Sequence, residues 1–436
     1  MPCPCLVRNR HLPIRTFLCW YGRPDVTPPD AVMSRYDLIV GAACPPERRD
    51  ALRRLKANIR FVVYVNAIDC RVVEGLPDVE RFDTGRRAVE HRHGRSHDRD
   101  LWTNHRDFFL RNRGGARGDA TDPREAFAWG YHRPYEATSR EANRFFLDPR
   151  SGWRDYYPEL CANAMQRGDY DGVFCDNAGP RIEWDFEHVA DDLKADITDA
   201  EWSRAMATML SNVARRLKRD NPDARVFANT CGGFVRADAD DIEPADFWRD
   251  ARIDGAMDEF FAFAERPGRD AYLPEATWRQ QVRAILCCEK LGRSYIAQAN
   301  GDEHNHAARV YALASFLIGA GERSVFNYNH APAAKYPLVY RFPEWDIDLG
   351  VPIAQYESLD EALDAGEGRA YARKFERGLV LVNPTDAPVD GIAVPADARR
   401  LALAGGTLTD GGRAAWEAVD TPVSLPPHAA AILSCG

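Results

Sequence analysis

Residues 171–176 read DGVFCD and residues 254–259 read DGAMDE, and these two stretches decide how the chain is expected to fold. Each begins with Asp-Gly, continues through apolar residues, and places a carboxylate five positions after the first Asp. Short apolar runs bounded by glycine and acidic residues are typical of strands in a parallel sheet. Similar runs at 14–20, 36–41, 61–66, 225–229, 295–298 and 324–328 bring the predicted strands to eight.

Helical patterns lie between several of these strands. Residues 45–58, 199–218, 275–291 and 305–319 carry apolar side chains at helical spacing, and TDAE at 198–201 predicts a capping box. Strands that alternate with helices in this way predict an α/β fold, a (β/α)8 TIM barrel, which we assign to residues 10–350.

The third and fourth predicted strands stand roughly a hundred residues apart, where one unit needs about thirty. We therefore predict that residues 71–150 are an insertion on the third βα connection, which places them over the active-site face of the barrel. The insertion is rich in Arg, His and Asp, with His91, His93, His97 and His105.

The pattern changes after about residue 355. Short runs at 369–375, 378–382, 391–394, 401–403, 422–425 and 429–433 are separated by turn signals such as NPTD at 383–386. Many short strands with turns between them predict a small antiparallel β-sandwich over residues 356–436.

Composition excludes several classes of protein. The 436 residues include 57 Lys and Arg against 66 Asp and Glu, which leaves a net charge of −9 and no general attraction to nucleic acid or anionic membrane. No apolar run approaches the ~20 residues of a membrane span. Eleven scattered cysteines and the absence of a signal-peptide pattern predict a cytoplasmic protein with reduced thiols, unless the natural N-terminus differs. No motif predicts a cofactor or a structural metal, and nothing predicts the oligomeric state.

Strand periodicity selects the candidate catalytic residues. Side chains alternate between the faces of a strand, so Gly172, Phe174 and Asp176 share one face. By the same alternation Glu259 points with Gly255 into the barrel, whereas Asp258 faces the helices. Two carboxylates would then meet at the carboxyl ends of the strands, where barrel enzymes hold their catalytic groups.

Two such carboxylates suit the cleavage of a glycosidic bond in an oligo- or polysaccharide. One must be ionised and the other protonated, and we assign Asp176 as nucleophile or base and Glu259 as general acid. The alternative is structural: Asp176 caps a turn and Glu259 pairs with an arginine.

Other strand ends carry side chains that suit sugar binding. Amides donate to and accept from hydroxyl groups, and aromatic faces stack on pyranose rings. Each of these residues could equally be an ordinary turn or core residue. The candidate substrate-binding residues are Asn66, Asn177, Asn229, Gln298, Asn327, Trp20, Tyr21 and Tyr328.

Residues 170–177 (YDGVFCDN) and 147–156 (LDPRSGWRDY) resemble the fourth-strand region of a bacterial hypothetical glycoside hydrolase family with a TIM barrel. That family is related to the polygalactosaminidase and exopolysaccharide hydrolase barrels. The resemblance covers about residues 12–350 and implies an active site of a fourth-strand Asp, a fifth-strand Asn and a sixth-strand Glu. The matching positions are Asp176, Asn229 and Glu259. The long insertion departs from the family pattern, and residues 378–384 are similar to the β-sandwich that follows many glycosidase barrels.

Two other functions remain open from the sequence. A barrel of this kind can bind carbohydrate without cleaving it, because fold does not fix activity. Alternatively, His304 and His306 in DEHNH at 302–306 could ligate the metal of a metal-dependent hydrolase. The acids of that segment also suit the N-terminus of the predicted helix that follows.

Overall fold

Eight parallel strands form a closed barrel in the computed structural model. The structure describes residues 14–20, 28–41, 44–72, 98–112, 126–132, 142–181, 196–230, 244–263, 272–330, 341–353, 356, 358–363, 370–404 and 413–435. The neighbour order is β1-β2-β3-β7-β8-β9-β10-β11, and a parallel bridge from Thr16 to Phe326 closes the circle. The predicted fold class is confirmed. The strands are β1 (Phe17–Cys19), β2 (Leu38–Val40), β3 (Arg60–Asn66), β7 (Gly172–Asp176), β8 (Arg225–Asn229), β9 (Gly255–Asp258), β10 (Ser294–Gly301) and β11 (Val325–His330).

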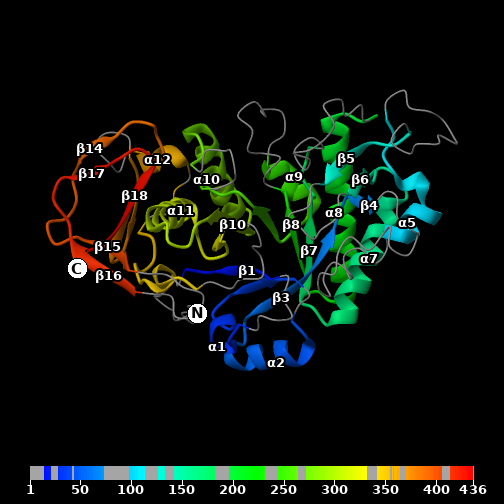
Figure 1. Cartoon of the computed structure of the whole chain (residues 1–436), viewed down its shortest axis with the longest axis horizontal. Helices are drawn as coiled ribbons and strands as arrows, with labels where there is room; N and C mark the ends of the chain where they lie inside the picture. The colour runs from blue at the N-terminus through cyan, green and yellow to red at the C-terminus, as the bar shows by residue number, and fades with distance from the viewer. Residues whose placement is uncertain are drawn as a thin grey trace, which may run out of the picture.

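Helices surround the barrel (Figure 1). They are α1 (Asp30–Met33), α2 (Pro46–Leu55), α7 (Trp153–Gly168), α8 (Asp199–Asp220), α9 (Pro244–Ala251), α10 (Glu275–Lys290) and α11 (His306–Gly319). The predicted capping box is confirmed, since Glu201 N donates to the Thr198 hydroxyl and Thr198 N donates to Glu201. Helix α7 was not predicted, and it contains Pro158, a residue that normally marks a helix end.

Apolar side chains from every strand fill the barrel interior. The layer consists of Phe17, Cys19, Leu38, Val40, Val62, Tyr64, Phe174, Phe227, Met257, Ile296 and Val325. Glycine begins β7 because a Cβ at Gly172 would lie 2.0 Å from the carbonyl oxygen of Arg225 on β8. This contact explains why glycine follows Asp171 at this crowded level of the barrel.

Three aspartates stabilise the N-terminal end of the barrel in the same way. Each precedes a strand and accepts a hydrogen bond from a backbone N–H on the neighbouring strand: Thr16 to Asp37, Phe61 to Asp171, and Val226 to Asp254, at 2.8, 2.8 and 2.9 Å. Each also pairs with basic side chains: Asp37 with Lys56, Asp171 with Arg53, and Asp254 with Lys218 and Arg225. The first Asp of both repeated stretches therefore has a structural role.

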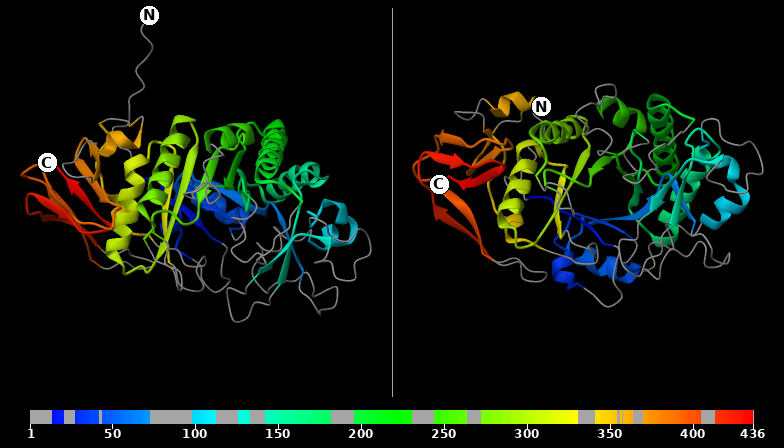
Figure 2. Two further views of the ribbon diagram at one scale, coloured as in Figure 1. Left: turned by 90° about the horizontal axis from the view of Figure 1, so that it is seen from above. Right: turned by 45° about the horizontal axis from the view of Figure 1, so that its top comes forward.

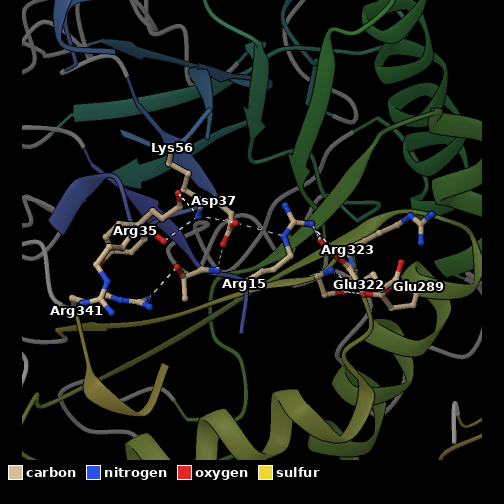
Figure 3. A network of polar contacts seen from close by, with 11 residues as sticks. Arg15, Arg35, Asp37, Lys56, Glu289, Glu322, Arg323 and Arg341 are labelled. Carbon is tan, nitrogen blue, oxygen red and sulfur yellow. Dashed lines mark hydrogen bonds and ion pairs between the residues drawn. The ribbon is translucent and has the colours of Figure 1, made fainter. Parts of the chain in front are cut away.

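The seam between β1 and β11 extends this network (Figure 3). Arg15 lies 3.8 Å from Asp37 and donates to the backbone carbonyls of Glu322 and Arg323. Glu289 in turn accepts from Arg323 N at 3.2 Å. Charged side chains thus link the first, second and last strands at this end of the barrel.

Part of the 71–150 region forms an antiparallel sheet in the order β4-β6-β5, built from β4 (Asp69–Val72), β5 (Trp129–His132) and β6 (Ala142–Phe146). Helix α5 (Asp98–Asn104) and the 3-10 helix η1 (Arg106–Phe108) accompany it. The sheet begins directly after β3, and Leu147 N donates back to Ile68 O at 2.8 Å. His91, His93 and His97 lie outside the described residues.

The C-terminal region is an antiparallel β structure at the opposite end of the molecule from the inserted sheet (Figures 1 and 2). Its five-stranded sheet has the order β12-β13-β18-β15-β16, and β14 pairs with β17. Apolar residues of both sheets, among them Leu381 and Val423, share one cluster. The strands are β12 (Tyr371–Phe375), β13 (Gly378–Asn383), β14 (Val389–Ile392), β15 (Arg399–Ala404), β16 (Arg413–Ala418), β17 (Val423–Leu425) and β18 (Ala429–Ser434).

Short elements connect the barrel to this region. They are the 3-10 helix η3 (Pro343–Asp346) and α12 (Leu359–Leu363). Arg373 on β12 is 1% exposed and donates to the carbonyls of Leu317 and Ala320 at the C-terminal end of α11, at 2.8 and 2.6 Å. Barrel and C-terminal sheet are therefore joined by charge-assisted hydrogen bonds that are shielded from water.

Candidate active site

Asp176 and Glu259 share one hydrogen-bond donor. Asn229 Nδ2 lies 3.1 Å from Asp176 Oδ1 and 3.2 Å from Glu259 Oε2. The three residues stand at the carboxyl ends of β7, β8 and β9, which are adjacent in the sheet. All three residues are partly exposed.

Asp176 also accepts a hydrogen bond from a residue that sequence analysis did not identify. The Tyr64 hydroxyl donates to Asp176 Oδ2 at 2.6 Å. Tyr64 points into the barrel from β3, is 9% exposed, and stacks on Phe174 with 6.4 Å between ring centroids. An inward aromatic residue within a run of valines is typical of core packing, so the sequence held no signal for this role.

The main chain of Glu259 is also held in place. Asn300 Nδ2 donates to Glu259 O at 2.5 Å, and Gln298 Nε2 lies 3.4 Å from Asn300 Oδ1. The sequence identified Gln298 but not Asn300, because β10 continues to Gly301, three residues beyond the predicted strand end.

Asp258 lies on the other side of the same strand, as its alternation predicts. It is buried and accepts from Gln281 Nε2 at 2.8 Å, from Tyr295 OH at 3.1 Å and from Phe260 N at 2.9 Å. Burial raises the pKa of this carboxyl above its ordinary value, and these three donors oppose the rise. Asp258 is thus a structural acid that faces α10.

Two predicted binding residues lie beside Asp176. Asn66 is buried, and its Oδ1 accepts from the backbone of Ile68 and Asp69, which shapes the turn into the inserted sheet. Its Nδ2 lies 3.4 Å from the Tyr64 hydroxyl. Asn177 directly follows Asp176 and adopts a left-handed backbone with φ of 53°.

The remaining candidates divide between the two faces of the barrel. Gln298 and Asn327 alternate in register with the interior residues Ile296 and Val325, and both are buried. No residue in the described part of the chain forms a hydrogen bond with Gln298 Oε1.

The aromatic candidates lie elsewhere. Trp20 and Tyr328 belong to the core outside the barrel, where Arg48 lies over the Trp20 indole and the Tyr328 hydroxyl donates to Asp302 O. Tyr21 lies outside the described residues.

The described ranges contain no group of three or more His, Cys, Asp or Glu residues arranged to hold a metal ion. His304 is exposed and lies 3.7 Å from Glu303, while His306 begins α11. Asn305 caps that helix by accepting from Ala308 N at 3.1 Å.

Among the helices in the described portion, none is long and apolar enough to span a membrane.

Solved structures of carbohydrate-active proteins show distant similarity to this chain. The glycoside hydrolase domain of PelA from Pseudomonas aeruginosa is 16% identical, with a TM-score of 0.42 over 77% of this chain and 97% of the domain. Aspergillus fumigatus Ega3, solved with galactosamine, is 10% identical, with a TM-score of 0.39 over 74% of this chain and 92% of that one. Eubacterium rectale Amy13B is 10% identical, with a TM-score of 0.44 over 98% and 96%.

No curated protein matches the sequence. The model of hypothetical glycosyl hydrolase family 15 matches residues 53–379, a span that holds Asp176, Asn229 and Glu259 and makes up well over half of the chain. The resemblance noted in the sequence is thereby confirmed, and the chain belongs to hypothetical glycosyl hydrolase family 15, so that it is a glycoside hydrolase.

Proposed function

We propose that this glycoside hydrolase cleaves an oligo- or polysaccharide by double displacement at Asp176 and Glu259. Asp176 is the nucleophile and Glu259 is the general acid and base. The observation that carries the proposal is the single amide nitrogen of Asn229, which lies within hydrogen-bond distance of both carboxylates.

The geometry around Asn229 is compatible with retention of configuration. Both oxygens lie close to the same nitrogen, so Asp176 Oδ1 and Glu259 Oε2 can be at most about 6.3 Å apart. Retaining glycosidases place their carboxyl groups roughly 5–5.5 Å apart, whereas inverting enzymes need roughly 6.5–9.5 Å to admit a water molecule. The bound applies to this one pair of oxygens and is compatible with the retaining arrangement, so the configuration of the product decides between the two mechanisms.

The hydrogen-bond partners support the division of roles. Each oxygen of Asp176 accepts from a neutral donor, Tyr64 OH or Asn229 Nδ2, which suits an ionised carboxylate. Glu259 is partly exposed, as a residue that protonates a leaving oxygen must be.

The reaction then follows in two balanced steps. Asp176 attacks the anomeric carbon while the bond to the leaving oxygen breaks, and that oxygen takes the proton of Glu259. Water next attacks the anomeric carbon and gives its proton to Glu259, and Asp176 departs as a carboxylate. Asn229 donates to both acids throughout.

Further residues would contact the saccharide around this centre. Asn177 and Asn229 are partly exposed beside Asp176 and can exchange hydrogen bonds with sugar hydroxyls. The inserted sheet starts from the same place, because Ala67 N donates to Asp176 O at 2.9 Å. We therefore assign the 71–150 insertion to the border of the substrate site.

Paired substitutions test the proposal. The wild-type enzyme is first screened on aryl glycosides and polysaccharides, and the best substrate is then used throughout. D176N and E259Q are each expected to lower turnover by more than about 10³-fold, because each removes a group that makes or breaks bonds. The matched controls D171N and D254N change the first acid of the same two strands and are expected to keep turnover within a few-fold.

Azide separates the two roles. With an activated aryl glycoside, D176A is expected to regain turnover in azide and release a glycosyl azide of inverted configuration, whereas E259A releases one of retained configuration. Wild-type turnover in both D176N and E259Q, or saccharide binding without cleavage by the wild type, would refute the proposal. An inverted product from the wild-type enzyme would refute double displacement.

A further inference from the structure

We propose that Tyr64 is a positioning residue that holds Oδ2 of Asp176 and so makes Oδ1 the attacking oxygen. This inference rests on the proposed function, because it concerns the nucleophile assigned there. The Tyr64 hydroxyl donates to Oδ2 at 2.6 Å, a distance typical of a strong bond between a hydroxyl and a carboxylate.

The ring of Tyr64 is well fixed. It is 9% exposed, belongs to the interior layer of the barrel, and stacks on Phe174, two residues before Asp176 on the neighbouring strand. Strand β3 pairs with β7 in a register that places Tyr64 beside Phe174 and Asn66 beside Asp176. Asn66 Nδ2 lies 3.4 Å from the Tyr64 hydroxyl and is placed to donate to it. The phenol proton is thereby directed toward Asp176.

The two oxygens of Asp176 therefore differ. Oδ2 is held by the short bond from β3, whereas Oδ1 lies toward β8 and β9 and shares its donor with Glu259. Attack by Oδ1 leaves Oδ2 as the carbonyl oxygen of the glycosyl ester, and Tyr64 keeps its proton in both states. No further reactant is needed for this step.

The strength of the Tyr64 bond changes during the reaction. A hydrogen bond to an ionised carboxylate is about twice as strong as one to a neutral acceptor. The bond weakens when Asp176 becomes an ester and recovers when the ester is hydrolysed, since the departing carboxylate regains its charge. Tyr64 should therefore assist the second step most.

Tyr295 provides a matched control. Its hydroxyl also donates to an aspartate on a barrel strand, Asp258, at 3.1 Å, and it is also buried. That pair lies on the helix-facing side of the sheet. Y64F and Y295F remove the same atom from the same kind of pair on opposite sides of the barrel wall, so a purely structural role would give similar results in both.

The test compares these variants on the substrate that the wild-type enzyme cleaves fastest. Y64F is expected to lower kcat by about 10- to 100-fold, as the loss of a charged hydrogen bond implies. It should lower KM as well, because the glycosyl enzyme accumulates, and intact mass spectrometry should detect that adduct. Y295F should leave all of these unchanged.

A second replacement covers the case in which Y64F folds poorly, which thermal unfolding would reveal. Replacing Tyr64 alone with 3-fluorotyrosine keeps the ring and makes the phenol a stronger donor, so kcat should not fall below that of the wild type and the glycosyl enzyme should not accumulate. If both Tyr64 variants behaved like Y295F while D176N was inactive, this inference alone would be overturned. An active D176N would overturn the proposed function instead.

Discussion

The two ends of the barrel hold their acids in opposite ways. At the N-terminal end, Asp171 and Asp254 accept from backbone N–H groups and pair with arginine and lysine side chains. At the C-terminal end of the same two strands, an amide nitrogen bridges Asp176 and Glu259, and a phenol donates to the former. The first set is held by ion pairs that stabilise the fold, whereas both donors to Asp176 are neutral, as its proposed role as a nucleophile requires.

Among changes that keep both acids, the largest expected effect comes from adding a charge to the C-terminal end. N229D would place a third carboxylate between Asp176 and Glu259 and replace their shared donor with a repelling acceptor. We expect kcat/KM at neutral pH to fall by about 10³-fold, a loss comparable to that of one strong catalytic donor. N229A removes the donor without adding charge, so its activity should lie between those of N229D and the wild type. Equal activity in N229D and the wild type would contradict the bridging role.

The next effect is expected at the N-terminal end and in stability alone. D254A leaves Val226 N without its acceptor and Lys218 and Arg225 without their partner. The free energy of unfolding in urea should fall by about 1–3 kcal/mol, the cost of an unsatisfied buried donor, and turnover per folded molecule should change less than about twofold. A large loss of turnover in the folded variant would show that the two ends are not independent.

The smallest effect concerns Asp258, the last residue of β9, whose side chain faces α10. Burial raises its pKa in the folded protein. At pH values between the ordinary pKa and the folded pKa, the folded state therefore keeps the proton, whereas the unfolded state has released it. The contribution of Asp258 to stability is therefore greatest below its ordinary pKa and is lost as the pH rises through the folded value. The unfolding free energy of D258N, measured in parallel across pH 3 to 8, should lack this fall. If the difference in unfolding free energy between the wild type and D258N did not vary with pH, the raised pKa of Asp258 would be contradicted.

The barrel could be predicted because its signals are local. Strands β7 and β8 begin and end at the predicted residues, and the alternation of side chains correctly separated Glu259 from Asp258. Helix α7 was not predicted, because Pro158 inside it normally marks a helix end. Strand β16 was not predicted either, because it has no strong apolar run. The same alternation, applied at the ends of β1 and β11, would have placed Trp20 and Tyr328 on the helix-facing side.

The site itself was only partly predictable. The facing acids follow from strand order, but the contact between Tyr64 and Asp176 joins residues more than a hundred positions apart. A tyrosine in the run RFVVYVN at residues 60–66 looks like any interior aromatic residue. Only the pairing of β3 with β7, across the whole insertion, gives that hydroxyl its partner.

The buried guanidinium of Arg373 limits how this chain can be divided. It terminates α11 by donating to two of the helix's last carbonyls, and burial lowers its pKa to about 10. A truncated enzyme that ends near residue 355 would expose those carbonyls and the apolar surface around them. An engineer who seeks a minimal catalytic unit should therefore keep the C-terminal sheets, because they cover the end of a barrel helix.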